Sequence, residues 1–197
     1  MSVGMSLLAI LEGQPMYGLQ LRNEFESRTG WIWPLNVGQV YTTLSRLERD
    51  GFVDSRPDEG REGQKVYEVT DAGRKRLGSW FGDPTGRPPP RRDELVLKLV
   101  MALRSRLVDP AEVIQGERKA MMQLLQEYTR LKRDAPADAD LGWTFLLDSL
   151  IFQTEARVRW LDACEARLER AGGAGPDKPS TPVPPFVRLS AGTEAGR

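Results

Sequence analysis

The sequence predicts a mainly α-helical chain with one small β-hairpin, and three observations lead to that fold class. Apolar residues recur at helical spacing through seven segments of the 197-residue chain. Two short apolar runs, at 52–56 and 66–69, flank a loop rich in glycine and charge, which is typical of two paired strands. Stretches that contain proline or glycine separate these segments.

The first two helices are expected over residues 2–12 and 17–28. Pro15 ends the first, because the residue before a proline disfavours helical geometry. In the second, Leu21 and Phe25 follow Tyr17 at successive steps of four, and Gly30 ends the pattern. The apolar segment 31–35 is expected to fill the gap between the second and third helices.

The third helix is the most strongly patterned segment of the chain. Asn36 is a favoured N-cap residue, and Gly51 is a favoured helix stop. At about 100° per residue, one arc of this helix is apolar and the opposite arc is polar. The apolar arc is Val37, Val40, Leu44 and Leu47.

The hairpin and a fourth helix complete the N-terminal part. Strands are expected at 52–56 and 66–69, and the loop 57–64 between them has the composition of an exposed turn. Thr70 and Asp71 are placed to begin a helix through Phe81. Three short helices followed by a hairpin form a winged helix-turn-helix, a fold whose third helix enters the major groove of DNA.

The C-terminal half is predicted to be helical. Further helices are expected over 91–107, 110–133 and 137–171, and the tail from 172 is expected to be disordered because it is poor in apolar residues. The predicted domains are a winged-helix DNA-binding domain, 1–82; a Pro/Gly linker, 83–90; a helical dimerisation domain, 91–171; and a disordered tail, 172–197.

The outer face of the third helix carries the residues expected to contact DNA. Asparagine, glutamine and arginine can each make paired hydrogen bonds to base edges in the major groove, and a helix N-terminus offers free backbone N–H groups to a phosphate. The candidates on this helix are Asn36, Gly38, Gln39, Tyr41, Thr42, Thr43, Arg46 and Arg49. A core role for Tyr41, and an ordinary solvated face for the whole helix, remain alternatives.

The wing adds Arg61, Gln64 and Lys65 as candidates for contact with the minor groove or phosphates. Acidic neighbours in the same loop make a solvated turn nearly as good an interpretation. Residues 1–82 hold ten basic and eleven acidic residues, so affinity for DNA must come from the placement of a few basic groups rather than from bulk charge.

Composition argues against several other function classes. The chain has no histidine, which removes the commonest general base and the commonest zinc ligand. No nucleotide-binding or nucleophile motif occurs, so neither an enzyme, a cofactor nor a metal site is expected. There is no apolar run long enough for a membrane span, and the single cysteine, Cys164, fits a reducing cytoplasm.

The last helix suggests a partner. Its apolar seam has a period near 3.5, as in a coiled coil. Trp143, Phe145, Phe152 and Trp160 fall on several faces, which makes it difficult for one helix inside a monomer to bury all of them. This favours a homodimer through the C-terminal helices; a pocket for a flat small molecule is the alternative.

These residues resemble the PadR family of bacterial transcriptional regulators. The resemblance is carried by residues 7–11, 15–21, 33–53, with its Gly38-Gln39-Val40-Tyr41 motif, and 67–73. Residues 92–99 and the helices after them look like the virulence-activator-like C-terminal region of the larger members. The resemblance implies a homodimeric repressor of an inverted-repeat operator. Because family members often respond to phenolic acids or drugs, a small-molecule effector is a further implied partner, with no residue assigned to it.

The sequence therefore predicts a sequence-specific regulator that binds double-stranded DNA. A winged helix used for protein–protein docking, without specific DNA binding, is the alternative from another class.

Overall fold

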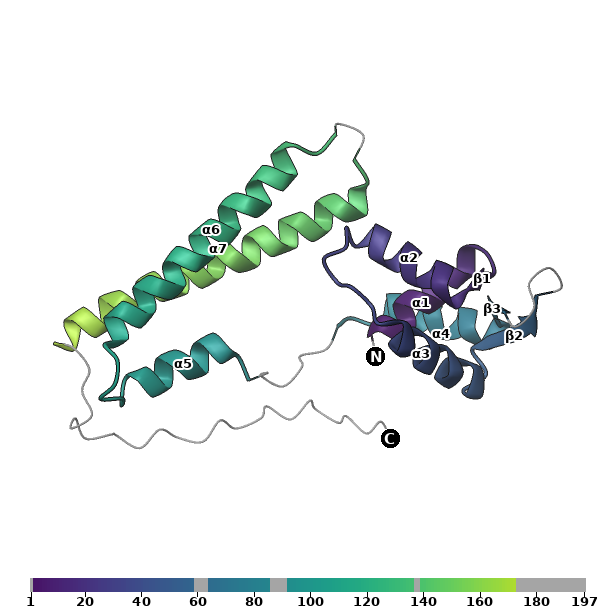
Figure 1. Ribbon diagram of the computed structural model, residues 1–197, viewed down its shortest axis with the longest axis horizontal. Coiled ribbons are helices and arrows are strands. Elements are labelled where there is room, and N and C mark those ends of the chain that lie inside the picture. The colour runs from purple at the N-terminus through teal and green to yellow at the C-terminus, as the bar shows by residue number, and fades with distance from the viewer. Residues whose placement is uncertain (1, 59–63, 86–91, 137–138, 173–197) are drawn as a thin grey trace, which may run out of the picture. The chain divides into compact units, whose positions relative to one another are not determined.

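The computed structural model describes residues 2–58, 64–85, 92–136 and 139–172. Its elements, labelled in Figure 1, are α1 (Ser2–Gly13), β1 (Met16–Tyr17), α2 (Gly18–Arg28), α3 (Val37–Arg49), β2 (Val53–Pro57), β3 (Lys65–Val69), α4 (Asp71–Gly82), α5 (Glu94–Ala102), α6 (Pro110–Arg133) and α7 (Leu141–Arg170). Contacts group the chain into two compact units, residues 1–91 with 122–156 and residues 92–121 with 157–197. The predicted fold class, mainly α with a small β wing, is confirmed. The predicted domain boundaries stay predictions.

A single apolar core holds α1 to α4 and the sheet together. Leu7, Leu8 and Leu11 of α1 are almost completely buried, as are Leu21 of α2 and Leu44 of α3. Residues 31–35 were expected to fill the gap between α2 and α3, but most of this segment lies outside the core. Only Leu35 enters the core, whereas the side chains of Trp31 and Trp33 are 63% and 52% exposed.

The sheet has three strands rather than the two that the sequence predicts. The order is β1-β3-β2, and both pairings are antiparallel. The hairpin places Val53 opposite Val69 and Pro57 opposite Lys65. β1 contains only Met16 and Tyr17, which pair with Tyr67 and Val66. Two residues are too few to show an alternating pattern, so β1 exists because β3 offers a free edge beside it.

Both predicted ends of α3 are present. Asn36 has extended backbone angles, and its Oδ1 accepts a hydrogen bond from the backbone N–H of Gly38 at 2.8 Å. At the other end, Gly51 has a positive φ of 75°. The N–H groups of Gly51 and Phe52 donate to the carbonyls of Glu48 and Leu47, which is the Schellman arrangement that ends helices at glycine.

Tyr67 of β3 has a buried phenol whose pKa is affected by residues of α3. Its side chain is buried, and burial raises the pKa of its phenol above the ordinary value of 10.0, with smaller contributions from the charge of Glu48 and from Tyr41. Because the pKa of Tyr67 is higher in the folded state, the unfolded chain loses the phenol proton at a lower pH than the folded chain does. The stability contributed by the neutral phenol is therefore complete below pH 10.0 and is lost as the pH rises through the pKa of the folded state.

We accordingly expect the free energy of unfolding to fall less steeply above pH 10 in Tyr67→Phe than in the wild type, because the phenylalanine has no proton to lose. Urea denaturation at a series of pH values measures this. Parallel pH profiles for the two proteins would contradict it.

The C-terminal helices are joined by apolar and ionic contacts. Leu95 and Leu99 of α5 pack with Ile114 of α6 and Leu161 of α7. α6 and α7 run antiparallel, because Arg118 pairs with Asp162 at 2.8 Å while Lys132, further along α6, pairs with Asp148, nearer the start of α7. Figure 1 shows the two helices side by side.

Two of these helices are shorter than predicted, for reasons of capping. Asp93 caps α5 by accepting the N–H groups of Leu95 and Val96. After Ala102 the chain turns, and Asp109 then accepts the N–H of Ala111 to begin α6. α7 begins at Leu141 rather than at 137, because Asp140 accepts the N–H of Trp143. The expected disorder of the tail concerns residues outside those described, apart from Gly172.

Candidate nucleic-acid interface

α3 presents one polar face outward because its other face is fixed in the core. Val40, Leu44 and Leu47 are 1%, 0% and 7% exposed. The opposite side chains are exposed along the whole helix. The predicted DNA-contact residues of this helix that are exposed are Asn36, Gly38, Gln39, Tyr41, Thr42, Arg46 and Arg49.

For two residues of α3, the structure reverses the predicted exposure. Thr43 is buried, at 5% exposure, so its side chain is not available to DNA, and its inclusion as a contact is corrected. A β-carbon on Gly4 of α1 would lie 3.5 Å from Thr43 Cγ2, so Thr43 packs at the α1–α3 contact. Val37, which was expected inside, is 44% exposed. The apolar arc is thus rotated by part of a turn toward Thr43.

The N-terminal turn of α3 is open to solvent. Asn36 uses its carbonyl oxygen Oδ1 for the cap, and its backbone carbonyl accepts the N–H of Val40. Gly38 has no side chain to cover the first turn, and nothing but the Asn36 cap lies within 4 Å of the position of a β-carbon there. This end can therefore approach a phosphate closely, as helix N-termini do.

Tyr41 is partly packed against α2 and partly exposed. Its side chain is 44% exposed. The ring lies against the start of α2, because a β-carbon on Gly18 would come within 2.8 Å of Tyr41 Cε1. One side of the ring is therefore packed on glycine backbone, and the remaining surface stays on the outer face of α3.

The charged side chains of α3 differ in whether they already have a partner within the protein. Arg49 is engaged by Asp50, with Nη2 and Nε at 2.9 and 3.0 Å from Oδ1. Glu48 accepts a hydrogen bond from the Ser55 hydroxyl at 2.5 Å, and this directs its carboxylate toward β2. Among the described residues, the side chain of Arg46 has no hydrogen-bond or ion-pair partner, so its guanidinium is available to a ligand. Ser45, which is not among the predicted contacts, is exposed on the same helix.

The wing is described only in part. Arg61 lies outside the described residues. Gln64 and Lys65 are exposed, and the carbonyl of Gln64 accepts the N–H of Asp58 at 2.9 Å. The Tyr17 hydroxyl donates a hydrogen bond to Asp58, which connects the base of the wing to β1.

Metal sites and membrane-spanning helices are both absent from the described part of the chain. No group of three or more histidine, cysteine, aspartate or glutamate side chains there could hold a metal ion. None of the helices described is both long and apolar enough to cross a membrane. The outer face of α3 remains the arrangement with a definite chemistry: amide, hydroxyl and guanidinium groups in one row.

Comparisons with known proteins agree with this geometry. The pattern of the transcriptional regulator PadR-like family matches residues 7–79, and that of the virulence activator alpha C-terminal region matches residues 91–169. A probable transcriptional regulator of Mycobacterium tuberculosis is 25% identical over 189 residues, covering 86% of this chain and 98% of the relative. The negative transcriptional regulator PadR of Bacillus subtilis is 23% identical over 175 residues, covering 84% and 96%.

Solved structures of the Bacillus subtilis protein share the fold. Its complex with operator DNA has a TM-score of 0.64 at 20% identity and covers 85% of this chain and 99% of that one. Its complex with p-coumaric acid has a TM-score of 0.63 at 22% identity and covers 85% and 98%. Two family patterns in the expected order, over a winged helix with helical C-terminal elements, show that the chain belongs to the PadR-like family of DNA-binding transcriptional regulators.

Proposed function

We propose that this regulator is a homodimeric repressor that binds an inverted-repeat operator through α3 and is released by a small-molecule effector. The observation that carries the proposal is the row of exposed polar side chains on α3, centred on Gln39, Thr42 and Arg46. Glutamine and arginine pair with adenine and guanine edges in the major groove, and threonine contacts either base type. Asn36, Gly38, Tyr41 and Arg49 border this row, and Lys65 and Gln64 stand in the wing.

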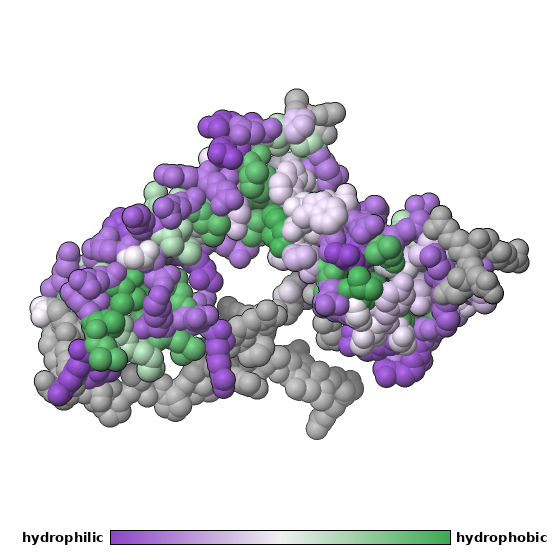
Figure 2. All heavy atoms as spheres, viewed as in Figure 1, coloured by the Kyte–Doolittle hydropathy of each residue, from purple (hydrophilic) through white to green (hydrophobic). Residues whose placement is uncertain are grey.

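Exposed apolar surface on the C-terminal helices supports the dimer. α5 buries Leu95 and Leu99 but leaves its other sides exposed, and Figure 2 shows apolar residues gathered over this helix. Phe145 and Phe152 of α7 are 64% and 63% exposed. Exposed apolar surface gathered on a helix is typical of protein–protein contacts. The exposed apolar residues of α5 and of the turn after it are Val96, Leu97, Val100, Met101, Leu103, Leu107 and Val108.

A relative supports repression rather than activation. The Bacillus subtilis relative is named a negative transcriptional regulator, and it has been solved both with operator DNA and with p-coumaric acid. We infer by analogy that this chain represses its target in the cytoplasm, and that a small organic effector lowers its affinity for DNA.

Selection of bound genomic fragments by the purified protein tests the proposal. We expect enriched fragments to share an inverted repeat and to bind about a thousandfold or more tighter than scrambled DNA of equal length. The selection is repeated with p-coumaric acid and other phenolic or drug-like compounds as candidate effectors. Equal affinity for enriched and scrambled DNA would contradict the proposal.

Salt dependence separates DNA binding from protein docking. A DNA contact releases counterions, so the logarithm of the association constant should fall linearly with the logarithm of salt concentration, by about 0.9 per phosphate contacted. Titrations of the enriched fragment from 50 to 200 mM salt measure the slope, where a protein with several phosphate contacts loses roughly a thousandfold in affinity. A slope near zero would instead favour a docking module, whose contacts are mainly apolar.

A further inference from the structure

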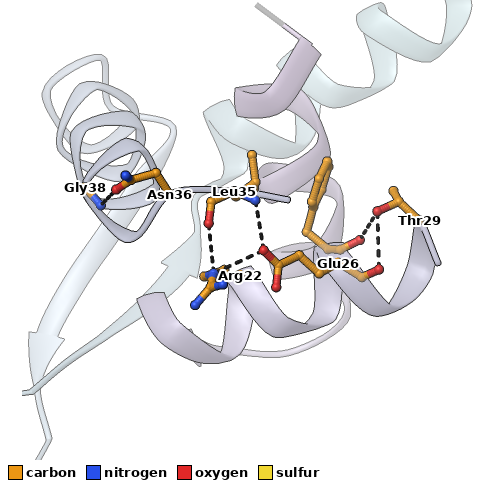
Figure 3. Close-up of polar contacts among 7 residues, drawn as sticks. Arg22, Glu26, Thr29, Leu35, Asn36 and Gly38 are labelled. Carbon is orange, nitrogen blue, oxygen red and sulfur yellow. Dashed lines mark hydrogen bonds and ion pairs between the residues drawn. The ribbon is translucent and has the colours of Figure 1, made fainter. Parts of the chain in front are cut away.

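A buried ionic pair on α2 lies beside the segment that leads into α3. The carboxylate of Glu26 is fully buried, whereas the side chain of Arg22, one turn earlier, is 31% exposed. Arg22 Nε donates to Glu26 Oε1 at 3.1 Å. Figure 3 shows both side chains directed at the backbone just before α3.

Both backbone groups of Leu35 are bound by this pair. Glu26 Oε1 accepts the N–H of Leu35 at 2.8 Å, and Arg22 Nε donates to the carbonyl oxygen of Leu35, also at 2.8 Å. The side chain of Leu35 is itself in the core. Leu35 is therefore held at three points, two of which are supplied by the ionic pair, which we term the Arg22–Glu26 clamp.

The other end of the same connection is fixed at Glu26 as well. The backbone carbonyl of Glu26 accepts the N–H of Trp31 at 2.7 Å, and Gly30 donates to Ser27. Gly30 and Trp31 have positive φ values of 54° and 61°. α2 thus ends in a tight Schellman turn, and one residue, Glu26, binds the α2–α3 connection at its start and at its end.

The clamp acts on the residue that sets the direction of α3. Asn36, the N-cap, follows Leu35 immediately, and Gly38 receives the cap hydrogen bond two residues later. The N–H and the carbonyl of Leu35 belong to the two planar peptide units on either side of it, so binding both orients both planes, the second of which contains the nitrogen of Asn36. The position of Gln39 and Thr42 in the groove depends on that direction, and specific contacts need placement to within about 0.5 Å.

The clamp has a part that apolar residues could not take. Glu26 Oε2 is buried and has no hydrogen-bond partner among the described residues. Taking charged groups out of water is costly, and apolar residues of similar volume are often as good for stability as a buried ionic pair. What apolar residues could not supply is a donor and an acceptor for the backbone of Leu35.

We propose that Arg22 and Glu26 are positioning residues that orient α3 for specific DNA reading, an inference that rests on the proposed function. Glu26 has no exposed surface and cannot touch DNA. Loss of its negative charge would, if anything, strengthen the general attraction to phosphates. A loss of specificity on its replacement therefore reports on orientation.

The test compares the double variant Arg22→Met/Glu26→Leu with Arg28→Met/Glu24→Leu. The control pair has the same residue types and spacing on the same helix, but its side chains are exposed, at 58% and 38%, and within the described residues neither forms a hydrogen bond to Leu35. Hydrogen exchange of the Leu35 and Gly38 amides is measured without DNA, and affinity is measured on the enriched operator and on scrambled DNA.

We expect faster exchange at Leu35 in the clamp variant alone. In the same variant, we also expect the ratio of operator affinity to scrambled-DNA affinity to fall about tenfold or more, because that is the effect of losing at least one base contact. Glu26→Gln, which keeps an acceptor for the Leu35 N–H, should restore most of the ratio. An unchanged ratio, unchanged exchange at Leu35, or a Glu26→Gln variant as defective as the double variant would overturn the proposal. A wild-type chain without operator preference would instead contradict the proposed function, and exchange at Leu35 would still report on the clamp.

Discussion

Arg46→Ala is expected to weaken specific operator binding by about 1–3 kcal/mol, the value of one arginine contact to a guanine edge. The guanidinium is exposed at the centre of the outer face of α3 and has no partner among the described residues. In the complex it would bind a base without first leaving an ion pair. Arg49, which is already bound by Asp50, should give a smaller effect.

Titration of the enriched operator at fixed salt measures this change. Arg46→Lys separates two roles, because lysine keeps the charge for a phosphate but lacks the planar, two-pronged donor for guanine. We expect Arg46→Lys to remain defective on the operator and near normal on scrambled DNA. Arg28→Ala on α2 is the control for loss of one exposed charge. Equal losses on operator and scrambled DNA would make Arg46 a phosphate contact instead, and no loss would remove it from the interface.

Gly73→Ala is expected to give the largest loss of stability. Gly73 lies in the first turn of α4 and is buried. A β-carbon there would lie 2.2 Å from the carbonyl oxygen of Phe52 and 2.8 Å from Val69 Cγ2. The obstacle is backbone, and it is fixed in place because the same carbonyl accepts the N–H of Thr70, the α4 N-cap. Overpacking of this kind costs about 1–3 kcal/mol or more.

Gly78→Ala is the matched control on the same helix. Gly78 is exposed, and nothing lies within 4 Å of its added β-carbon. Because glycine inside a helix is less favourable than alanine, this variant should be more stable by roughly 0.5–1 kcal/mol. Urea denaturation compares the two proteins. Equal midpoints for Gly73→Ala and the wild type would show that α4 can move away from Phe52 without cost.

Local signals in the sequence were sufficient for much of the fold. Asn36 and Gly51 mark the two ends of α3, and the structure has the cap and the Schellman turn that these residue types favour. Pro110 is another local signal, because proline is favoured at the first position of a helix and α6 begins there. The order of helices and hairpin then predicted the winged helix, because few folds contain that order.

Features that depend on tertiary contacts could not be predicted in this way. β1 forms only because β3 lies beside it, and Thr43 is buried because α1 crosses α3 at Gly4, a contact that helical periodicity alone cannot assign. The Arg22–Glu26 clamp left no separate signal in the sequence. An arginine and a glutamate four residues apart look like an ordinary exposed pair, as Glu24 and Arg28 are, until the backbone of Leu35 is seen between them.

In the proposed complex, two α3 faces bind DNA as a symmetric pair. Half-sites for such a pair are spaced by about one helical turn or a near multiple. Inserting about five base pairs between the half-sites of the enriched operator rotates one of them by half a turn relative to the other. We expect the affinity of the dimer for this lengthened operator to fall to that for a single half-site. Unchanged affinity for the lengthened operator would contradict it.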